Sequence, residues 1–328
     1  MNIKILGESK MKTIKITLLS LGVLMGTTQL YADVIPGINS KGGGMLLPEG
    51  KLKVAYKYMN FDRNSMFDGS NEVPNKEQLN ATANINILML KYGISSDFNI
   101  ALIAPHKNLE ATAKLGPNNV AIDNSGIGDI LLMGIYKLTD MKQDGYQTAL
   151  KFGIKLPTGS TDDGFKKAPP FAQNVNTPLP TQMGTGAAEY KLGIGGSKLF
   201  DHARVDANMM FTYRPKAEYD YDFGNELSYD IGYMYALHEK FNIGLEYNGK
   251  YNSSTDMGND TNPMLRKMLP FKAFSGTVGY VTPQIQFLPF GKPKIHLDMG
   301  VSFLLHENVK EYQPLEKKRF IVRFGYLF

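Results

Sequence analysis

The chain has 328 residues, with 36 Lys and Arg against 31 Asp and Glu, a formal net charge of +5, and neither Cys nor Trp. The absence of Cys excludes disulfide scaffolds, cysteine-ligated zinc and iron–sulfur sites, and thiol nucleophiles. A mean hydropathy of −0.23 with 33 Gly and 17 Pro is not the composition of a helical membrane protein.

The amino terminus predicts a secretory signal peptide. An apolar run over 16–25 is too short to span a bilayer, and Ala32 offers the small residue of a cleavage site. We therefore expect residues 1–32 to be removed, with either Met1 or Met11 as the true start. The removal takes away four Lys and one Glu and leaves a net charge of +2, a balance that argues against nucleic acid as a partner.

Apolar and polar residues alternate with a period of two through the rest of the chain. Near the carboxyl end, for example, Ile295, Leu297 and Met299 alternate with His296 and Asp298. Such alternation is typical of strands with one apolar and one polar face. Twelve segments show it, and they cover residues 51–59, 83–93, 98–105, 127–138, 146–156, 187–199, 204–214, 226–237, 241–248, 272–286, 295–305 and 319–328.

The connections between these segments alternate between short and long. Residues 139–145 form a short one, for example, whereas 106–126 and 157–186 form long ones. Short turns, long loops, strands of about 10 residues and aromatic residues near the strand ends are the features of outer-membrane barrels. The sequence thus predicts an all-β fold over residues 51–328: a transmembrane antiparallel up-and-down β-barrel of about twelve strands, with short periplasmic turns and long extracellular loops.

A soluble sandwich or propeller is the alternative for period-two strands, but its apolar face would favour Val, Leu and Ile over rows of Tyr. The last residues support the barrel, because Phe324, Tyr326 and Phe328 alternate up to a terminal aromatic ring. This ending resembles the signal read by the barrel assembly machinery, so we expect that machinery and outer-membrane lipid as partners. Lys91 fits poorly, since it breaks the lipid face of its strand.

Catalysis finds little support in the sequence. The chain has five His, and none has a nearby Ser in a recognisable motif. Glycine-rich segments do not follow a parallel strand into a helix, and no acidic cluster has metal-ligand spacing. We therefore expect no enzyme activity, no catalytic residue, no cofactor and no metal.

The polar faces of the strands carry charges of both signs, which we expect to line the lumen and the translocation path. They are Lys151, Lys155, Arg204, Asp206, Arg214, Glu226, Asp230, Glu246, Asp298, Arg319 and Arg323. Mixed charges in a narrow barrel form either internal ion pairs that hold the wall or a selectivity ring, and the first alternative is the more common. Inward glycines, such as Gly193, Gly195, Gly300 and Gly325, predict a cavity in the periplasmic half of the lumen.

Several motifs together resemble a known family. They are 50–58 (GKLKVAYKY), 126–130 (GIGDI), 149–159 (ALKFGIKLPTG) and 184–190 (GTGAAEY), which resemble the outer-membrane transporters of the phenol meta-cleavage pathway family. The resemblance covers most of the mature chain. It implies a β-barrel and uptake of aromatic or other hydrophobic compounds, and it identifies no catalytic residue.

Two segments stand outside this pattern. Residues 33–50, with Gly42-Gly-Gly44, predict a periplasmic segment or a partial plug, and the Pro-rich loop 157–186 is expected to lie over or fold into the mouth. Together the features predict a channel in the bacterial outer membrane for passive uptake of small hydrophobic or aromatic solutes. The alternative is a non-transporting structural or adhesive barrel.

Overall fold

The structure is a computed structural model that describes residues 34–168, 170, 173, 175–258 and 275–328. The predicted signal peptide over 1–32 lies outside the described residues. Among the residues that are described, no helix is both long and apolar enough to cross a bilayer.

Strands dominate the described chain. Their bounds are β1 Leu52–Gly69, β2 Asn71–Val73, β3 Asn80–Gly93, β4 Phe98–Leu115, β5 Asn118–Ile127, β6 Ile130–Lys137, β7 Gln147–Leu156, β8 Glu189–Leu199, β9 Ala203–Tyr213, β10 Glu226–His238, β11 Phe241–Asn252, β12 Ser275–Phe287 and β13 Ile295–Leu327. One short helix, α1 Met141–Asp144, lies in the turn between β6 and β7, and two 3₁₀ turns cover Leu179–Thr181 and Glu218–Asp220.

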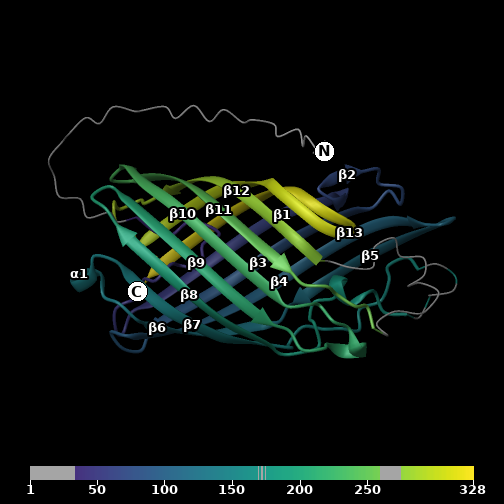
Figure 1. Ribbon diagram of the computed structural model, residues 1–328, viewed down its shortest axis with the longest axis horizontal. Helices are drawn as coiled ribbons and strands as arrows, with labels where there is room; N and C mark the ends of the chain where they lie inside the picture. The colour runs from purple at the N-terminus through teal and green to yellow at the C-terminus, as the bar shows by residue number, and fades with distance from the viewer. Residues whose placement is uncertain (1–33, 169, 171–172, 174, 259–274) are drawn as a thin grey trace, which may run out of the picture.

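The sheet closes on itself as an antiparallel barrel. Eleven strands follow one another in the order β13 to β6, then β4, β3 and β1, and β1 pairs with β13 to complete the ring. The backbone N–H of Phe328 donates to the Leu52 carbonyl at 2.8 Å where the first and last strands meet. The tilted strands wrap around a common axis, with α1 and the carboxyl terminus at one end and β2 and β5 at the other (Figure 1).

The wall is crossed twelve times, as the sequence predicts. β13 pairs with β12 through one arm and with β1 through the other, and the Leu327 N–H donates to the Lys294 carbonyl at 2.8 Å, so the element turns back on itself near Glu311. Glu311 has a left-handed φ of 62°, which suits such a turn. β5 and β6 together form another crossing, because both pair with β4.

Three of the expected long loops, 60–82, 106–126 and 306–318, are partly wrong, the first because β1 continues to Gly69 and is followed by β2. Residues 106–126 are mostly strand, because β4 and β5 continue as a hairpin beyond the rest of the wall, and 306–318 form the tip of the β13 hairpin. These extensions still follow a period of two, but they carry polar residues on both faces, which the sequence analysis took as loop.

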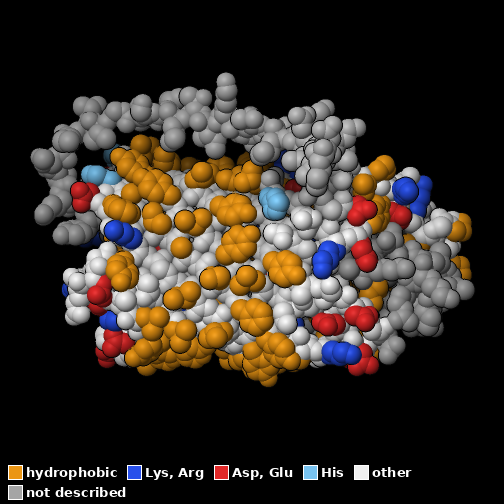
Figure 2. Space-filling model, in the orientation of Figure 1, with side chains coloured by type: hydrophobic (Ala, Val, Ile, Leu, Met, Phe, Trp, Pro, Cys, Tyr) orange, Lys and Arg blue, Asp and Glu red, His pale blue; other side chains and the backbone are white. Residues whose placement is uncertain are grey.

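The outer face of the barrel is apolar. Leu305 is 54% exposed, and Ile231, Phe211 and Phe324 are nearly as exposed. Hydrophobic side chains cover the strands as a broad band, whereas Asp, Glu, Lys and Arg gather mostly towards its two ends (Figure 2). In a closed sheet the backbone N–H and C=O groups form hydrogen bonds with neighbouring strands, so no unpaired edge remains. Such a sheet with an apolar outer face and a polar interior spans a membrane, with its apolar surface against hydrocarbon.

The expected cavity in the periplasmic half is wrong, because the inward glycines are covered by neighbours. A Cβ atom on Gly325 would overlap the His296 imidazole, and one on Gly195 would overlap the carbonyl of Gly43. A Cβ on Gly300 would make tight contacts with Thr282 at 3.2 Å and Ile38 at 3.3 Å. These glycines give room to other groups rather than leaving space empty.

Close packing at Gly325 predicts that a substitution there lowers the stability of the barrel more than a substitution at Gly232, another glycine of the lumen. Gly325→Val pushes the buried His296 ring from its place, and overpacking of this kind costs about 1–3 kcal/mol. The matched control is Gly232→Ala, because the nearest atom to its new Cβ is Glu246 Cγ at 3.7 Å, an ordinary contact. Urea unfolding of the purified barrel in detergent should show a lower midpoint for Gly325→Val alone. Equal midpoints for the two variants would contradict this packing.

Candidate functional site

The amino-terminal end of the described chain lies inside the barrel. Residues 34–48, here called the plug, have no regular secondary structure, and Val34, Ile35 and Ile38 are at most 4% exposed. The sequence predicts either a periplasmic segment or a partial plug over 33–50. The structure places 34–48 against the lumen wall of the turn-side half.

Side chains of the wall hold the plug through its backbone. Gln284 accepts from the N–H of Ile38 at 2.7 Å, and Glu246 accepts from the N–H of Asn39 at 2.9 Å. Arg323 donates to the carbonyl of Pro36 at 2.8 Å. A segment without secondary structure needs hydrogen-bond partners for its buried backbone N–H and C=O groups. Here the side chains of the wall provide these partners, as the backbone of a neighbouring strand would in a sheet.

The same pattern continues across the lumen. Lys151 donates to the Lys41 carbonyl at 2.6 Å, Ser197 accepts from the N–H of Gly44 at 2.9 Å, and Asn99 accepts from the N–H of Leu47 at 2.6 Å. The anchors thus come from β13, β12 and β11 on one side and from β7, β8 and β4 on the other. The plug is a floor that bridges opposite walls.

Glycine is required where the plug touches the wall. Gly43 has a left-handed φ of 55°, and a Cβ on it would overlap Asp206 and Ser197. A Cβ on Gly44 would overlap the carbonyl of Gln147, whose amide donates to the Gly44 carbonyl at 3.1 Å. The Gly42-Gly-Gly44 run therefore allows the close backbone approach that seals this part of the lumen.

Burial also affects the one Lys of the plug. Lys41 lies 3.9 Å from the buried carboxylate of Asp230 and donates to Ser228 at 2.6 Å. Desolvation lowers the pKa of Lys41 from its ordinary value, and the nearby carboxylates offset only part of this effect.

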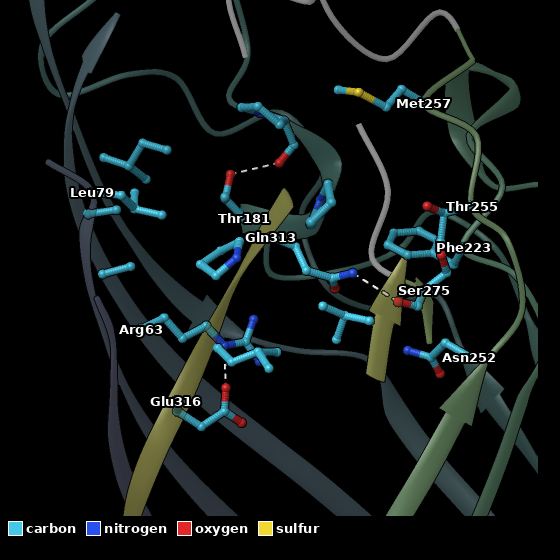
Figure 3. A pocket seen from close by; sticks show the side chains of 18 of the residues that line it. Arg63, Leu79, Thr181, Phe223, Asn252, Thr255, Met257, Ser275, Gln313 and Glu316 are labelled. Atoms are coloured by element: carbon cyan, nitrogen blue, oxygen red, sulfur yellow. Dashed lines mark hydrogen bonds and ion pairs between the residues drawn. The ribbon is translucent and has the colours of Figure 1, made fainter. Parts of the chain in front are cut away.

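A cavity of about 630 Å³ lies on the loop side of the barrel. Its outer part is walled by apolar side chains from several strands and loops, including Leu79, Leu115, Val120, Phe223, Met257 and Val278. Leu79 lies across the space from Phe223 and Met257, and Arg63 and Glu316 lie deeper, where they pair (Figure 3). An apolar cleft with few polar groups at its base is the usual form of a small-molecule site.

The loop 157–186 folds inward, as expected, in its described part. Pro178, Pro180 and Thr181 line the cavity, and Leu179 and Met183 are at most 1% exposed. Asn124 donates to the Thr181 carbonyl at 3.1 Å and ties this loop to β5. The loop therefore narrows the mouth.

Charged side chains form a tier at the base of the cavity. Glu316, only 2% exposed, accepts from Arg63 at 2.7 Å and from Arg319 at 3.0 Å. Lys155 contacts Asp129 at 2.8 Å and Glu189 at 2.7 Å. These pairs bridge adjacent wall strands, and their carboxylates are buried, whereas the Arg63 side chain is 38% exposed.

The predicted lumen residues divide between the tier and the plug. The structure places Lys155, Arg214, Glu226 and Arg319 at the base of the cavity, and Lys151, Arg204, Asp206, Asp230, Glu246, Asp298 and Arg323 around the plug. Both groups contain ion pairs, such as Arg204 with Asp206 at 2.6 Å and Arg323 with Asp298 at 2.6 Å. Their part in translocation stays a prediction.

Sequence reasoning missed several charged residues of the site. Lys107 and Glu316 lie on extended strands that were taken as loops, and Arg63 falls in the extension of β1. Lys91 was placed on the lipid face, which is wrong: its ammonium donates to the Met45 carbonyl of the plug at 2.9 Å. Following the period of two past each expected strand end would have found Lys107, because it shares a face with Asn99, whose polar side chain marks the lumen side of β4.

Two observations bear on other chemistry. The described residues contain no group of three or more His, Asp or Glu side chains placed to hold a metal ion. His296 faces the lumen, fully buried, and its Nδ1 lies 3.0 Å from Asp298, whose carboxylate also binds Arg323. The structure thus uses this His in the wall network beside the plug.

A closed, lipid-facing barrel with a plugged interior and a loop-side cavity defines a membrane-spanning β-barrel of the outer-membrane type. The chain belongs to the family described as "Putative MetA-pathway of phenol degradation", whose profile matches residues 64–324. This confirms the resemblance found in the sequence. A search of curated protein sequences returned no match.

Solved structures share the fold. The COG4313 outer membrane channel from Pseudomonas putida F1 superposes with a TM-score of 0.62 at 14% identity, covering 88% of this chain and 99% of that one. The P. putida toluene transporter TodX gives a TM-score of 0.41 at 10% identity, covering 86% and 91%. The NanC porin gives 0.44 at 9% identity, covering 84% and 98%. The first likeness shows the barrel fold, and the other two are too weak to carry an argument.

The shielded pair at Glu316 predicts a large loss of stability when its charge is removed. Glu316→Gln leaves two guanidinium groups without their shared carboxylate, and breaking a buried ion pair costs about 3–5 kcal/mol. Glu72→Gln is the matched control, since its pair with Lys317 is about half exposed and such pairs contribute about 0–1 kcal/mol. Thermal unfolding in detergent measures both. A shift for Glu316→Gln no larger than that of the control would show that the pair does not hold the wall.

Proposed function

We propose that this chain is a passive channel of the bacterial outer membrane that takes up small hydrophobic or aromatic solutes. The observation that carries the proposal is the cavity of about 630 Å³ within the lumen, whose outer walls are apolar. Its volume lies within the range of about 300–1,000 Å³ that is usual for small-molecule sites. A general water-filled pore would instead have a polar lining along its whole length.

In this proposal the solute enters between the extracellular loops, rests in the cavity and passes the charged tier. The plug then closes the path, because its backbone is bonded to opposite walls through Gln284, Glu246, Lys151 and Asn99. Passage requires these bonds to be exchanged for bonds to water. A net hydrogen bond contributes about 0.5–1.5 kcal/mol, and about 1.5–3 kcal/mol where one partner is charged, as in the bonds of Glu246 and Lys151. In this proposal the bonds are exchanged one at a time, so the plug is released while the barrel stays folded.

The proposal includes partners and no catalytic role. The apolar outer wall contacts outer-membrane lipid, and the terminal residues Phe324, Tyr326 and Phe328 are proposed to guide assembly by the barrel machinery. Their placement supports this, since Phe324 and Phe328 are about half exposed on the outer wall at the closing strand. Assembly in a strain depleted of that machinery tests it.

The plug also supports the alternative, a barrel that transports nothing. A reversible lock distinguishes the two functions. Ser40 Oγ of the plug lies 3.3 Å from Asn208 Nδ2 of the wall, and the chain has no Cys of its own, so Ser40→Cys with Asn208→Cys introduces a single pair for a disulfide. The initial rate of labelled toluene uptake is measured in porin-deficient cells that express the variant, because an intact outer membrane is a barrier to such solutes.

We expect uptake several-fold above that of cells without the protein when the pair is reduced, and a fall to that background on oxidation. Each single Cys variant is the control, since it carries half of the change and cannot form the bond. Reduced cells with no uptake above background would contradict the proposed channel. Uptake that is the same in the oxidised and reduced states would show that the plug lies outside the path.

A further inference from the structure

Three ammonium groups at the base of the cavity have no carboxylate within hydrogen-bond distance among the described residues. Lys107 donates to the Met183 carbonyl at 2.6 Å. Lys191 donates to Thr212 at 2.9 Å and lies 3.8 Å from Glu189, and Lys250 lies 3.9 Å from Glu226. They come from β4, β8 and β11, so they reach the cavity from separate parts of the wall.

The other cations of the tier are already paired. Arg63 and Arg319 share Glu316, Lys155 binds Asp129 and Glu189, and Arg214 donates to Glu226 at 3.0 Å. Glu77 accepts from Tyr312 at 2.6 Å nearer the mouth. Within the part of the chain that the structure describes, the tier and the cavity together thus have seven cations and five carboxylates, an excess of positive charge.

This excess faces an enclosed, apolar space. A cation that is partly removed from water is stabilised by an anion brought to it, and a charge-assisted hydrogen bond is roughly twice as strong as a neutral one. Above the tier, Leu115, Val120 and Phe165 offer apolar contacts to whatever body the anion carries. The site is therefore apolar towards its mouth and cationic at its base.

We propose that the cavity selects amphipathic monoanions: an aromatic or alkyl body against the apolar walls, with a carboxylate directed at Lys107, Lys191 and Lys250. This inference rests on the proposed channel function and names the class of its solute. A neutral molecule of the same shape makes the same contacts with the apolar walls, but it brings no negative charge to the three ammonium groups. An ammonium in place of the carboxylate is repelled.

Three probes of one shape test the charge. Binding of 4-fluorobenzoate, 4-fluorobenzyl alcohol and 4-fluorobenzylamine to the full chain in an uncharged detergent is measured by fluorine NMR. We expect the carboxylate to bind about tenfold more tightly than the alcohol, as one charge-assisted bond in place of a neutral one allows, and the amine to bind most weakly.

A pair of double variants assigns the effect to the cavity. Lys107→Gln with Lys250→Gln should bring the carboxylate to within about twofold of the alcohol, because two ammonium groups that have no carboxylate within hydrogen-bond distance are removed while the apolar walls remain. Lys114→Gln with Lys240→Gln is the matched control: it makes the same change of charge at exposed residues outside the cavity lining and should leave the preference unchanged. Lys107→Arg with Lys250→Arg keeps the charge and should keep the preference.

The outcomes separate this inference from the function on which it rests. Equal binding of the carboxylate and the alcohol overturns the inference and leaves a channel for neutral solutes standing. Loss of the preference in the control as well as in the cavity variant assigns it to the overall charge and also overturns the inference. Failure of all three probes to bind removes the cavity as a solute site and with it the proposed function.

Discussion

Hydrogen-bond closure between β1 and β13 is the constraint on which the rest of this structure depends. Hydrocarbon offers no partner to a backbone N–H or C=O, so an open sheet edge cannot lie in a bilayer. The ladder from Lys53 opposite Leu327 to Phe61 opposite Arg319 removes that edge. Once the ring is closed, side chains that alternate along each strand must face either lipid or the lumen, and every charge near the middle of the wall is forced inward.

The charges so enclosed need partners, and the chain supplies them from two sources. In the loop-side half they pair with one another, as Glu316 does with Arg63 and Arg319. In the turn-side half a large part of the bonding comes from the plug, whose carbonyls accept from Arg323, Lys151 and Lys91. The plug thus both fills the lumen and provides hydrogen-bond partners for the charged side chains of the wall. These bonds explain how a segment without secondary structure is held in one place.

The wall could be predicted from the sequence because its signal is local. A period of two, turn lengths and aromatic strand ends each lie within about ten residues. They predict the strands from β6 to β12, where these are described, with ends that differ by up to four residues from those observed, as in β11. Strand ends were lost where polar residues occupy both faces, as in the hairpin that carries Lys107. There the strand leaves the bilayer and the apolar mark of the lipid face disappears.

The plug and the cavity could be predicted only in outline, because they depend on contacts between distant parts of the chain. Gln284 and Ile38 are 246 residues apart, and nothing in either segment indicates the other. The inward glycines illustrate the same limit: their small size was read correctly, but what fills the space at Gly195 and Gly300 is the plug. Glycine at an inward position of a strand shows that a side chain is missing there. It does not show which distant part of the chain fills the space.

In the proposed channel, release of the plug changes which groups the charged side chains of the lumen wall contact. Apart from the Lys41 ammonium beside Asp230, the plug contacts the wall charges mostly through backbone N–H and C=O groups, which carry only partial charges. Its departure therefore leaves the wall charges themselves unchanged and exchanges their partners for water. Lys57, Lys91 and Lys151 then face the lumen with no carboxylate within ion-pair distance among the described residues, and the carboxylates of Asp230 and Glu246 also lose their partners in the plug. The three ammonium groups outnumber the two carboxylates, so the charge released by the plug has the same sign as the excess at the base of the cavity, and the field proposed to attract an anion continues towards the periplasmic end.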